Sequence, residues 1–370
     1  MSATQNAEDA GRSGLEGVVV ADTVMSRVDG LAGHLVIRGY DVEVLAASAR
    51  FEDVCALLWQ GSTPGSEAGR EAGREIGQAR LRAHARLPGL GGALKLPNAM
   101  EALRAGIAQL SVEAEPELDP RYELVGACAV YAAAWARLRA GQQPVAPDPG
   151  RGHAEDYLRM VRGEEPGERA AALDAYLVTV ADHGMNASTF TARVAASTDS
   201  DPVSIVTAAL CSLKGPLHGG APGPVLDMLD AVDTPDAAAE WVEAELAAGR
   251  RIMGIGHRVY RVRDPRAAVL ERQVERLEIA GVALDRLSFA RAVEKVAVDA
   301  LQRRHPDRPL EANVEFYTAV LLDAVGLPRE LFTPTFACAR TAGWLAHAAE
   351  QKQNGRLIRP ACRYTGPEPV

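Results

Sequence analysis

Apolar side chains recur along most of the chain at the spacing of an α-helix. In the clearest segment they lie at positions i, i+3, i+4, i+7 and i+8 and so share one helix face: Val293, Val296, Ala297, Ala300 and Leu301. Residues 203–213 repeat this spacing, and Gly215 and Pro216 then provide the usual stop signal for a helix. The pattern predicts a mostly helical protein in which His218 lies just past a helix end.

Strand-like alternation is confined to the start of the chain. It occurs in residues 18–22 and 34–42, which are separated by the turn-like residues 28–33. No regular alternation of strands and helices follows, and neither a G-x-G-x-x-G motif after a strand nor a P-loop is present. The predicted fold is therefore all-α with one short N-terminal β-hairpin.

Three further segments have a recognisable pattern. Residues 124–136 form the longest apolar run, which is too short for a membrane span of about 20 residues and predicts a buried helix. Residues 70–89 predict a charged surface helix that ends near Pro88. Residues 139–157 are rich in proline and glycine and are interpreted as a non-helical connection.

Composition excludes several classes of protein. A chain of 370 residues has room for two domains, or for one domain with a large insertion. Its 40 basic and 49 acidic side chains leave a net charge of -9, which argues against a nucleic-acid partner. The five cysteines lack ligand spacing, which argues against zinc, redox and disulfide motifs, and the polar start lacks the features of a secretory signal. These features indicate a cytoplasmic protein without a membrane or metal partner.

Three histidines share an unusual setting, because each lies beside a glycine: His183 in ADHGMN, His218 in PLHGG and His257 in GIGHRVY. One such histidine is more often an ordinary turn residue. Three of them favour a site, since glycine lets backbone amides and imidazoles approach a ligand closely.

Arginines and one acidic residue extend this set. Arg266, Arg340 and Arg359 are each compatible with a solvated surface position, but guanidinium groups are also what an acidic protein needs to bind a dicarboxylate. Glu315 follows Asn313 in an apolar setting. It is either an exposed residue at a helix start or a base in a dry pocket, and the local pattern leaves both interpretations open.

Several motifs in a fixed order resemble those of the citrate synthase family. They are LEGVVVADT, HLVIRGYDVEVLA, ADHGMNASTFTARVAAS, LKGPLHGGAPGPVLDML, RIMGIGHRVYRVRDPRA, NVEFYTAVLLDAVGLPRELFTPTFACARTAGWLAH and RLIRP, and together they extend from about residue 15 to 366. The resemblance implies an almost entirely helical homodimer. Each subunit would have a large domain, residues 1–218 and 331–370, and a small domain, residues 219–330, that closes over the substrates.

The resemblance also implies an acyltransferase that condenses oxaloacetate with acetyl-CoA to citrate and CoA, without a metal or redox cofactor. His218 matches the histidine that donates a hydrogen bond to the thioester oxygen, and His257 the histidine that polarises the ketone of oxaloacetate. His183, Arg266 and Arg340 match groups that hold oxaloacetate.

Two further parts of the site are implied in the same way. Arg359 matches an arginine that the other subunit contributes, so that the active sites would be shared across the dimer. The loop that contacts the adenine of CoA through its backbone is matched by five residues: Ile252, Met253, Gly254, Ile255 and Gly256.

The chain departs from the family pattern at two positions. Glu315 stands where the family usually has the aspartate that removes a proton from acetyl-CoA, and Pro222 where it often has asparagine. The extra methylene of glutamate moves the carboxylate, and a shift of about 1 Å can cost on the order of 100-fold in rate. Three functions therefore stay open: citrate synthase, 2-methylcitrate synthase acting on propionyl-CoA, and a weakened relative that senses CoA or dicarboxylates.

Overall fold

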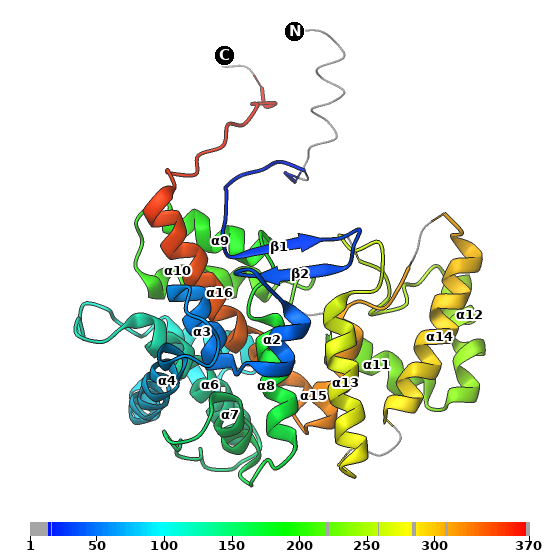
Figure 1. The fold of residues 1–370 in the computed structure, drawn as a ribbon, viewed down its shortest axis with the longest axis horizontal. Helices are drawn as coiled ribbons and strands as arrows, with labels where there is room; N and C mark the ends of the chain where they lie inside the picture. The colour runs from blue at the N-terminus through cyan, green and yellow to red at the C-terminus, as the bar shows by residue number, and fades with distance from the viewer. Residues whose placement is uncertain are drawn as a thin grey trace.

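The structure is a computed structural model that describes residues 14, 15, 17–219, 222–257, 259–282, 286–307 and 310–367. The polar start from which the absence of a secretory signal was inferred lies mostly outside the described residues. The regular structure of the described chain is mostly helix, as the sequence predicts, with a small sheet near its start (Figure 1). None of its helices is long and apolar enough to cross a membrane.

The elements follow one another along the chain in a simple order. The strands are β1 (Ser26–Asp29), β2 (His34–Ile37) and β3 (Tyr40–Asp41). The α-helices of the first half are α2 (Val42–Ser48), α3 (Phe51–Gln60), α4 (Glu67–Arg86), α5 (Ala99–Ile107), α6 (Pro120–Arg139), α7 (His153–Arg162), α8 (Arg169–Val180), α9 (Ala187–Ala196) and α10 (Pro202–Leu213). Those of the second half are α11 (Pro222–Val232), α12 (Ala238–Ala247), α13 (Pro265–Ile279), α14 (Arg286–Arg304), α15 (Val314–Ala324) and α16 (Phe332–Asn354). Four short 3-10 helices complete the list: η1 (Leu87–Leu90), η2 (Ala93–Lys95), η3 (Pro235–Ala237) and η4 (Arg329–Leu331).

The N-terminal hairpin is present as part of a three-stranded sheet, but its first strand lies later than predicted, and the strand expected over residues 34–42 is divided into β2 and β3. β1 pairs with β2 in antiparallel register, with Ser26 opposite Ile37 and Asp29 opposite His34. Residues 18–22, which were predicted to form the first strand, have no strand structure. Their β-branched side chains favour extended backbone, but no neighbouring strand pairs with them.

The core is built around α6, which confirms the buried helix predicted for residues 124–136. Its side chains from Tyr122 to Trp135 are buried on all sides, as expected for a helix surrounded by others. It packs against α4, α5, α7 and α16. The close approach of α4 depends on Gly126, where a Cβ atom would lie 2.8 Å from the Cβ of Ala79.

Two predictions about charged and irregular segments need correction. The helix predicted for residues 70–89 ends at Arg86, close to the expected place, but one face is buried and Arg80 has no exposed surface. The connection predicted for residues 139–157 is irregular only as far as Gly152, because α7 begins at His153. The last of the helix-breaking prolines and glycines in this segment is Gly152, and an amphipathic helix begins directly after it.

Helices α11 to α15 gather on one side of the molecule, to the right in Figure 1. Helix α13 packs against α15 within this group and against α8 of the remaining structure. The helices predicted from residues 203–213 and 293–301 are confirmed as α10 and α14. Pro222 is the first residue of α11, a position where the missing N–H of proline needs no partner.

Candidate active site

Six of the predicted site residues line one cleft. The cleft has a volume of about 830 Å³, which is in the range of pockets that enclose small molecules. Its walls come from the N-terminal segment between residues 14 and 20, the loop before α9, the turn after α10, the loop before α13 and the first turn of that helix, the N-terminus of α15 and the first half of α16. The predicted residues that it brings together are His183, His218, His257, Arg266, Glu315 and Arg340.

His218 lies in the turn that follows α10. The turn is closed by backbone hydrogen bonds from the N–H of His218 to Gly215 O and from the N–H of Gly219 to Leu213 O, both 3.0 Å. The imidazole Nε2 is 2.8 Å from Ser188 Oγ, and the indole N–H of Trp344 donates to the same oxygen at 3.1 Å. One ring nitrogen of His218 is thereby held by the protein.

Burial governs the charge of His218. It lowers the pKa of the imidazole to about 4, and the positive charge of Arg340 acts in the same direction. The ring is therefore neutral near pH 7, so that one nitrogen carries a proton and the other does not.

His257 is oriented by the backbone of its own loop. Its Nδ1 accepts hydrogen bonds from the N–H groups of Val259 at 2.9 Å and Tyr260 at 3.0 Å. Burial, assisted by Arg266, lowers the pKa of this imidazole to about 4. A neutral ring that accepts at Nδ1 carries its proton on Nε2, which makes Nε2 a hydrogen-bond donor.

His183 lies beside His257, with ring centroids 6.0 Å apart. The hydroxyl of Tyr260 is 3.3 Å from His183 Nε2, and the Tyr260 ring is 4.7 Å from that of His257. Burial lowers the pKa of His183 well below its usual value, with a further contribution from Arg266. All three histidines are thus neutral donors or acceptors near pH 7.

The two arginines of the cleft are almost completely buried. Arg266, the second residue of α13, donates from Nε and Nη2 to Asp264 at 3.0 and 2.7 Å. Burial lowers the pKa of its guanidinium, but Asp264 more than offsets this effect and the pKa is raised. Arg340 donates from Nε to Val180 O at 2.7 Å, and burial lowers its pKa to about 10. Both remain positively charged near neutral pH.

Glu315 projects from the first turn of α15, where the Asn313 side chain caps the helix by accepting from the Glu315 N–H at 2.9 Å. Burial raises the pKa of the carboxyl to about 7, although Arg266 and Arg340 act against the rise. A carboxyl that loses its proton near pH 7 is suited to act as a general base.

The remaining predicted residues do not line the cleft. Residues 252–256 lie next to it, where Ile255 pairs with Ala312 in an isolated bridge and Asn313 Nδ2 donates to Gly256 O at 2.7 Å. Arg359 is exposed in the extended segment after α16. Among the described residues of this protomer, neither Arg359 nor any of residues 252–256 lines the cleft.

Sequence reasoning assigned no role to several residues that support the site. Ser188 and Trp344 hold His218, Tyr260 links His183 and His257, and Asn313 caps the helix of Glu315. All four lie inside motifs that carry the family resemblance. The spacing of Ser188 and Trp344 gave no signal, because they meet His218 from other segments. Asn313 did carry a local signal, since asparagine is a favoured helix N-cap.

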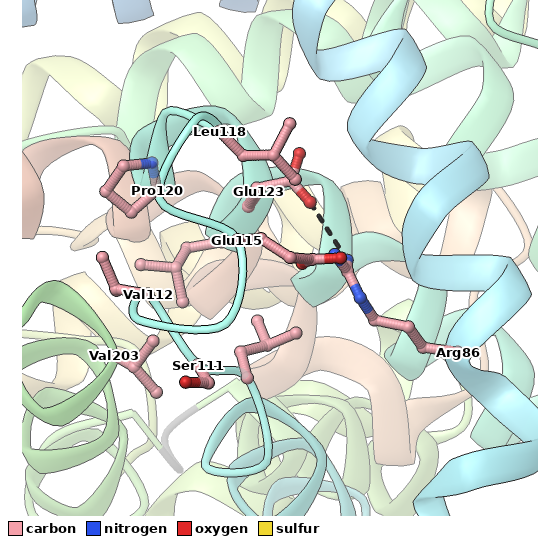
Figure 2. Close-up of a pocket in the computed structure, with 10 residues that line it drawn as sticks. Arg86, Ser111, Val112, Glu115, Leu118, Pro120, Glu123 and Val203 are labelled. Carbon is pink, nitrogen blue, oxygen red and sulfur yellow. Dashed lines mark hydrogen bonds and ion pairs between the residues drawn. The ribbon is translucent and has the colours of Figure 1, made fainter.

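A second cavity differs sharply from the cleft. Its volume is about 20 Å³, which is room for roughly one water molecule. Figure 2 shows Arg86 reaching into it from α4, where Nη1 donates to Glu123 Oε2 at 3.0 Å and Nη2 to Glu115. This pocket holds an ion-pair network and is too small for a substrate. In the described part of the chain, no group of three or more histidine, cysteine, aspartate or glutamate side chains is arranged to hold a metal.

Comparison with known proteins identifies the family. The family profile described as "Citrate synthase, C-terminal domain" matches residues 14–361. The chain is 40% identical over 374 residues to the citrate synthase of Haloferax volcanii, covering 96% of each protein. It is 38% identical to the putative citrate synthase 2 of Mycobacterium tuberculosis, covering 96% of this chain and 93% of that protein.

Solved structures agree with this assignment. The crystal structure of the Thermotoga maritima citrate synthase superposes with a TM-score of 0.84 at 33% identity and covers 97% of both chains. The Thermoplasma acidophilum citrate synthase, solved as a ternary complex with carboxymethyl coenzyme A and oxaloacetate, gives a TM-score of 0.85 at 27% identity with the same coverage. The chain belongs to the citrate synthase family of acyltransferases.

Proposed function

We propose that the protein condenses oxaloacetate with acetyl-CoA and hydrolyses the product to citrate and free CoA. The observation that carries this proposal is the presence in one cleft of a carboxyl with a pKa of about 7 and two neutral histidines, beside two buried arginines. The ternary complex of the Thermoplasma enzyme with oxaloacetate and a CoA derivative supports the choice of substrates.

Enolisation is the first step of the proposed mechanism. Ionised Glu315 removes a proton from the methyl carbon of acetyl-CoA, while His218 donates a hydrogen bond to the thioester oxygen. For this role the proton of the His218 ring has to be on Nδ1. This requires Ser188, which donates its hydroxyl proton to Asn186 Oδ1 at 2.9 Å in this structure, to turn that proton to His218 Nε2 over their 2.8 Å separation. The hydrogen bond lowers the energy of the developing enol, which a carboxylate alone could not form at a useful rate.

Carbon–carbon bond formation follows. The enol carbon attacks the ketone carbon of oxaloacetate, and His257 donates its Nε2 proton to the ketone oxygen as it becomes a hydroxyl. The amides of Val259 and Tyr260, which occupy Nδ1, keep the proton on the required nitrogen. Water then attacks the thioester carbon of the citryl-CoA intermediate and gives one proton back to the His257 ring. The C–S bond breaks, and the CoA thiolate takes up the proton that Glu315 removed in the first step. No metal or redox cofactor takes part.

The arginines and His183 hold oxaloacetate in this proposal. Arg266 and Arg340 are buried cations that together match the two carboxylates of the substrate. His183 contributes a neutral ring beside His257. Residues 252–256 contact the adenine of CoA through backbone atoms, as the family resemblance implies.

The two-domain division also belongs to the proposal. Residues 1–218 with 331–370 supply His183, His218 and Arg340, and residues 219–330 supply His257, Arg266 and Glu315. A cleft that draws half of its groups from each part is suited to open for substrate entry and to close for chemistry. A homodimer, in which Arg359 would reach the active site of the partner, is expected from the family resemblance, and Arg359 is exposed outside the cleft of its own protomer. A cytoplasmic location stays a prediction.

Release of free thiol from acetyl-CoA and from propionyl-CoA, each with oxaloacetate, tests the proposed function. Citrate synthase activity predicts a higher kcat/KM with acetyl-CoA. A preference for propionyl-CoA would instead identify a 2-methylcitrate synthase. If neither thioester reacts while oxaloacetate or CoA still binds, the protein is a sensor rather than an enzyme.

A further inference from the structure

The N-terminal hairpin contacts the two loops that carry His183 and His257. Its first strand begins beside the His183 loop, where Ser26 Oγ donates to the carboxylate of Asp182 and accepts the N–H of Gly184 at 2.8 Å. These two partners directly flank His183 in the chain. Asp182 is completely buried and is also 3.1 Å from His347 Nε2, so that Ser26 is anchored to a fixed group.

The turn at the other end of the same strand contacts the His257 loop. Gly30 O accepts the N–H of Arg261 at 2.8 Å. A Cβ atom at Gly30 would lie 2.3 Å from Val259 O, and one at Gly33 would lie 2.7 Å from Val262 Cγ2. The turn therefore fits against residues 259–262 only because both positions are glycine.

This contact reaches the groups that orient the His257 ring. Val259 and Tyr260, which donate their amides to His257 Nδ1, belong to the segment on which the turn rests. A displacement of Val259 would move one of these amides directly.

The strand between the two contacts is a stiff connection. Ser26 and Gly30 are four residues apart, which corresponds to roughly 13 Å of extended strand. β1 is paired with β2 over all four of its residues, so its length is fixed by the ladder of hydrogen bonds.

We propose that the hairpin of residues 26–37 is a positioning element of the active site, in which Ser26, Gly30 and Gly33 fix the distance between His183 and His257. The two imidazole rings, 6.0 Å apart, come from segments more than 70 residues apart in sequence, and the hairpin touches both. The inference rests on the proposed function, because it assigns these histidines to oxaloacetate.

Alanine substitutions at the turn test the proposal, each with a matched control. Gly30→Ala is compared with Gly89→Ala, where an added Cβ meets nothing within 4 Å. Gly33→Ala, at a φ of +71°, is compared with Gly39→Ala, which has a φ of +90° in the same sheet but open space around it. Neither Gly30 nor Gly89 has a positive φ, and Gly33 and Gly39 both have one, so in each pair the first member differs chiefly by its collision with the His257 loop.

We expect Gly30→Ala and Gly33→Ala to lower kcat/KM for oxaloacetate by about 10- to 100-fold, with a KM for acetyl-CoA close to that of the wild type. Calorimetric titration with oxaloacetate should show a parallel loss of affinity. The two controls should keep wild-type values apart from a small change in melting temperature. If both turn variants differ from their controls only in melting temperature, the proposal is overturned.

Ser26→Ala provides a test that adds no volume and so avoids misfolding by collision. Ser26→Ala removes the hydroxyl that links Asp182 to Gly184 and should weaken oxaloacetate binding by about tenfold, whereas Ser26→Thr keeps the hydroxyl and should restore it. Equal affinities of the two variants would contradict the positioning role. A wild-type protein that neither turns over nor binds oxaloacetate would instead refute the proposed function, and this inference with it.

Discussion

Two buried arginines show how the scaffold and the cleft of this protein differ. Arg80 of α4 and Arg340 of α16 are both at most 1% exposed. Arg80 donates from Nε to Asp156 at 2.8 Å, and from Nη2 to the carbonyl oxygens of Asp148 at 3.1 Å and Arg151 at 2.9 Å. Its Nη1 is 3.3 Å from His153 Nδ1. Every nitrogen of this guanidinium has a protein partner.

Arg340 has far fewer partners. Among the described residues its one hydrogen bond is from Nε to Val180 O, and its Cζ lies 4.5 Å from the ring centroid of Phe336. The residue lines the cleft, so its terminal nitrogens remain available to a ligand. Because both arginines are equally buried, burial alone does not identify which of the two charges is functional. A buried charge whose hydrogen-bonding groups face a cavity does, because an unpaired buried cation is costly unless a ligand satisfies it.

The largest expected effect comes from removing the charge of Glu315. Glu315→Gln should lower kcat by about 10²- to 10⁴-fold, the usual contribution of a general base, and His218→Ala should lower it by orders of magnitude as well. Steady-state assays on folded protein measure both losses. Near-normal turnover in either variant would refute the assigned roles.

The same substitution should make the protein more stable. Burial raises the pKa of Glu315 to about 7 from an ordinary value of 4.5, so folding favours the protonated form and the wild type loses stability as pH rises from about 4.5 to 7. Glu315→Gln removes this loss, which is worth at most about 3 kcal/mol at pH 8. Denaturant unfolding at pH 5 and pH 8 should show that the gain exists only at the higher pH.

Replacing each arginine by methionine tests the comparison directly. Arg80→Met leaves Asp156 buried without its main cation and should cost about 3–5 kcal/mol in the free energy of unfolding. Arg340→Met should lower kcat/KM for oxaloacetate at least about 100-fold, with little loss of stability. Equal losses of stability in the two variants would show that Arg340 is also a structural residue.

The pH dependence of the reaction follows from the carboxyl and histidines of the cleft. kcat/KM should rise about tenfold per pH unit below pH 7 and level off above it, because the base is active only when Glu315 is ionised. His218 and His257, with pKa values lowered to about 4, stay neutral throughout this range. A rate that is already constant from pH 5 upwards would contradict the assignment of Glu315 as the base.

Local patterns predicted most of the fold, since helix periodicity and stop signals depend on neighbouring residues. The end of α10 before His218 and the burial of α6 follow from such patterns. The strand expected at residues 18–22 was wrong, because a strand also needs a partner, and no local pattern reveals whether one is near.

The active site could not be predicted from spacing in the same way. His183 and Arg340 lie 157 positions apart, and only the family resemblance placed them together. Ser188 and Tyr260 were missed because a serine or tyrosine acquires its role from the histidine that it contacts. The small ion-pair pocket of Figure 2, lined mostly by residues 110–124, was likewise not predicted.

The smallest expected effect on catalysis concerns a carboxyl of the scaffold that resembles Glu315 in its pKa alone. Burial, together with the nearby carboxylate of Glu52, raises the pKa of Asp174 to about 8, although the Phe51 N–H donates to it at 3.2 Å. Asp174 is not among the residues that line the cleft. Its titration should therefore change stability and leave catalysis unaffected.

The sign of this effect follows from the raised pKa. Asp174 stays protonated in the folded protein above the pH at which it ionises in the unfolded chain, so the free energy of unfolding of the wild type should slope downward as pH rises above about 4. Asp174→Asn keeps an oxygen for the Phe51 N–H and should remove this slope, whereas Asp236→Asn, at an exposed position, should not. The free energy of unfolding at several pH values and the kcat of each variant test this expectation. A change of kcat in Asp174→Asn would mean that a raised pKa marks function in this protein even where no cavity adjoins the group.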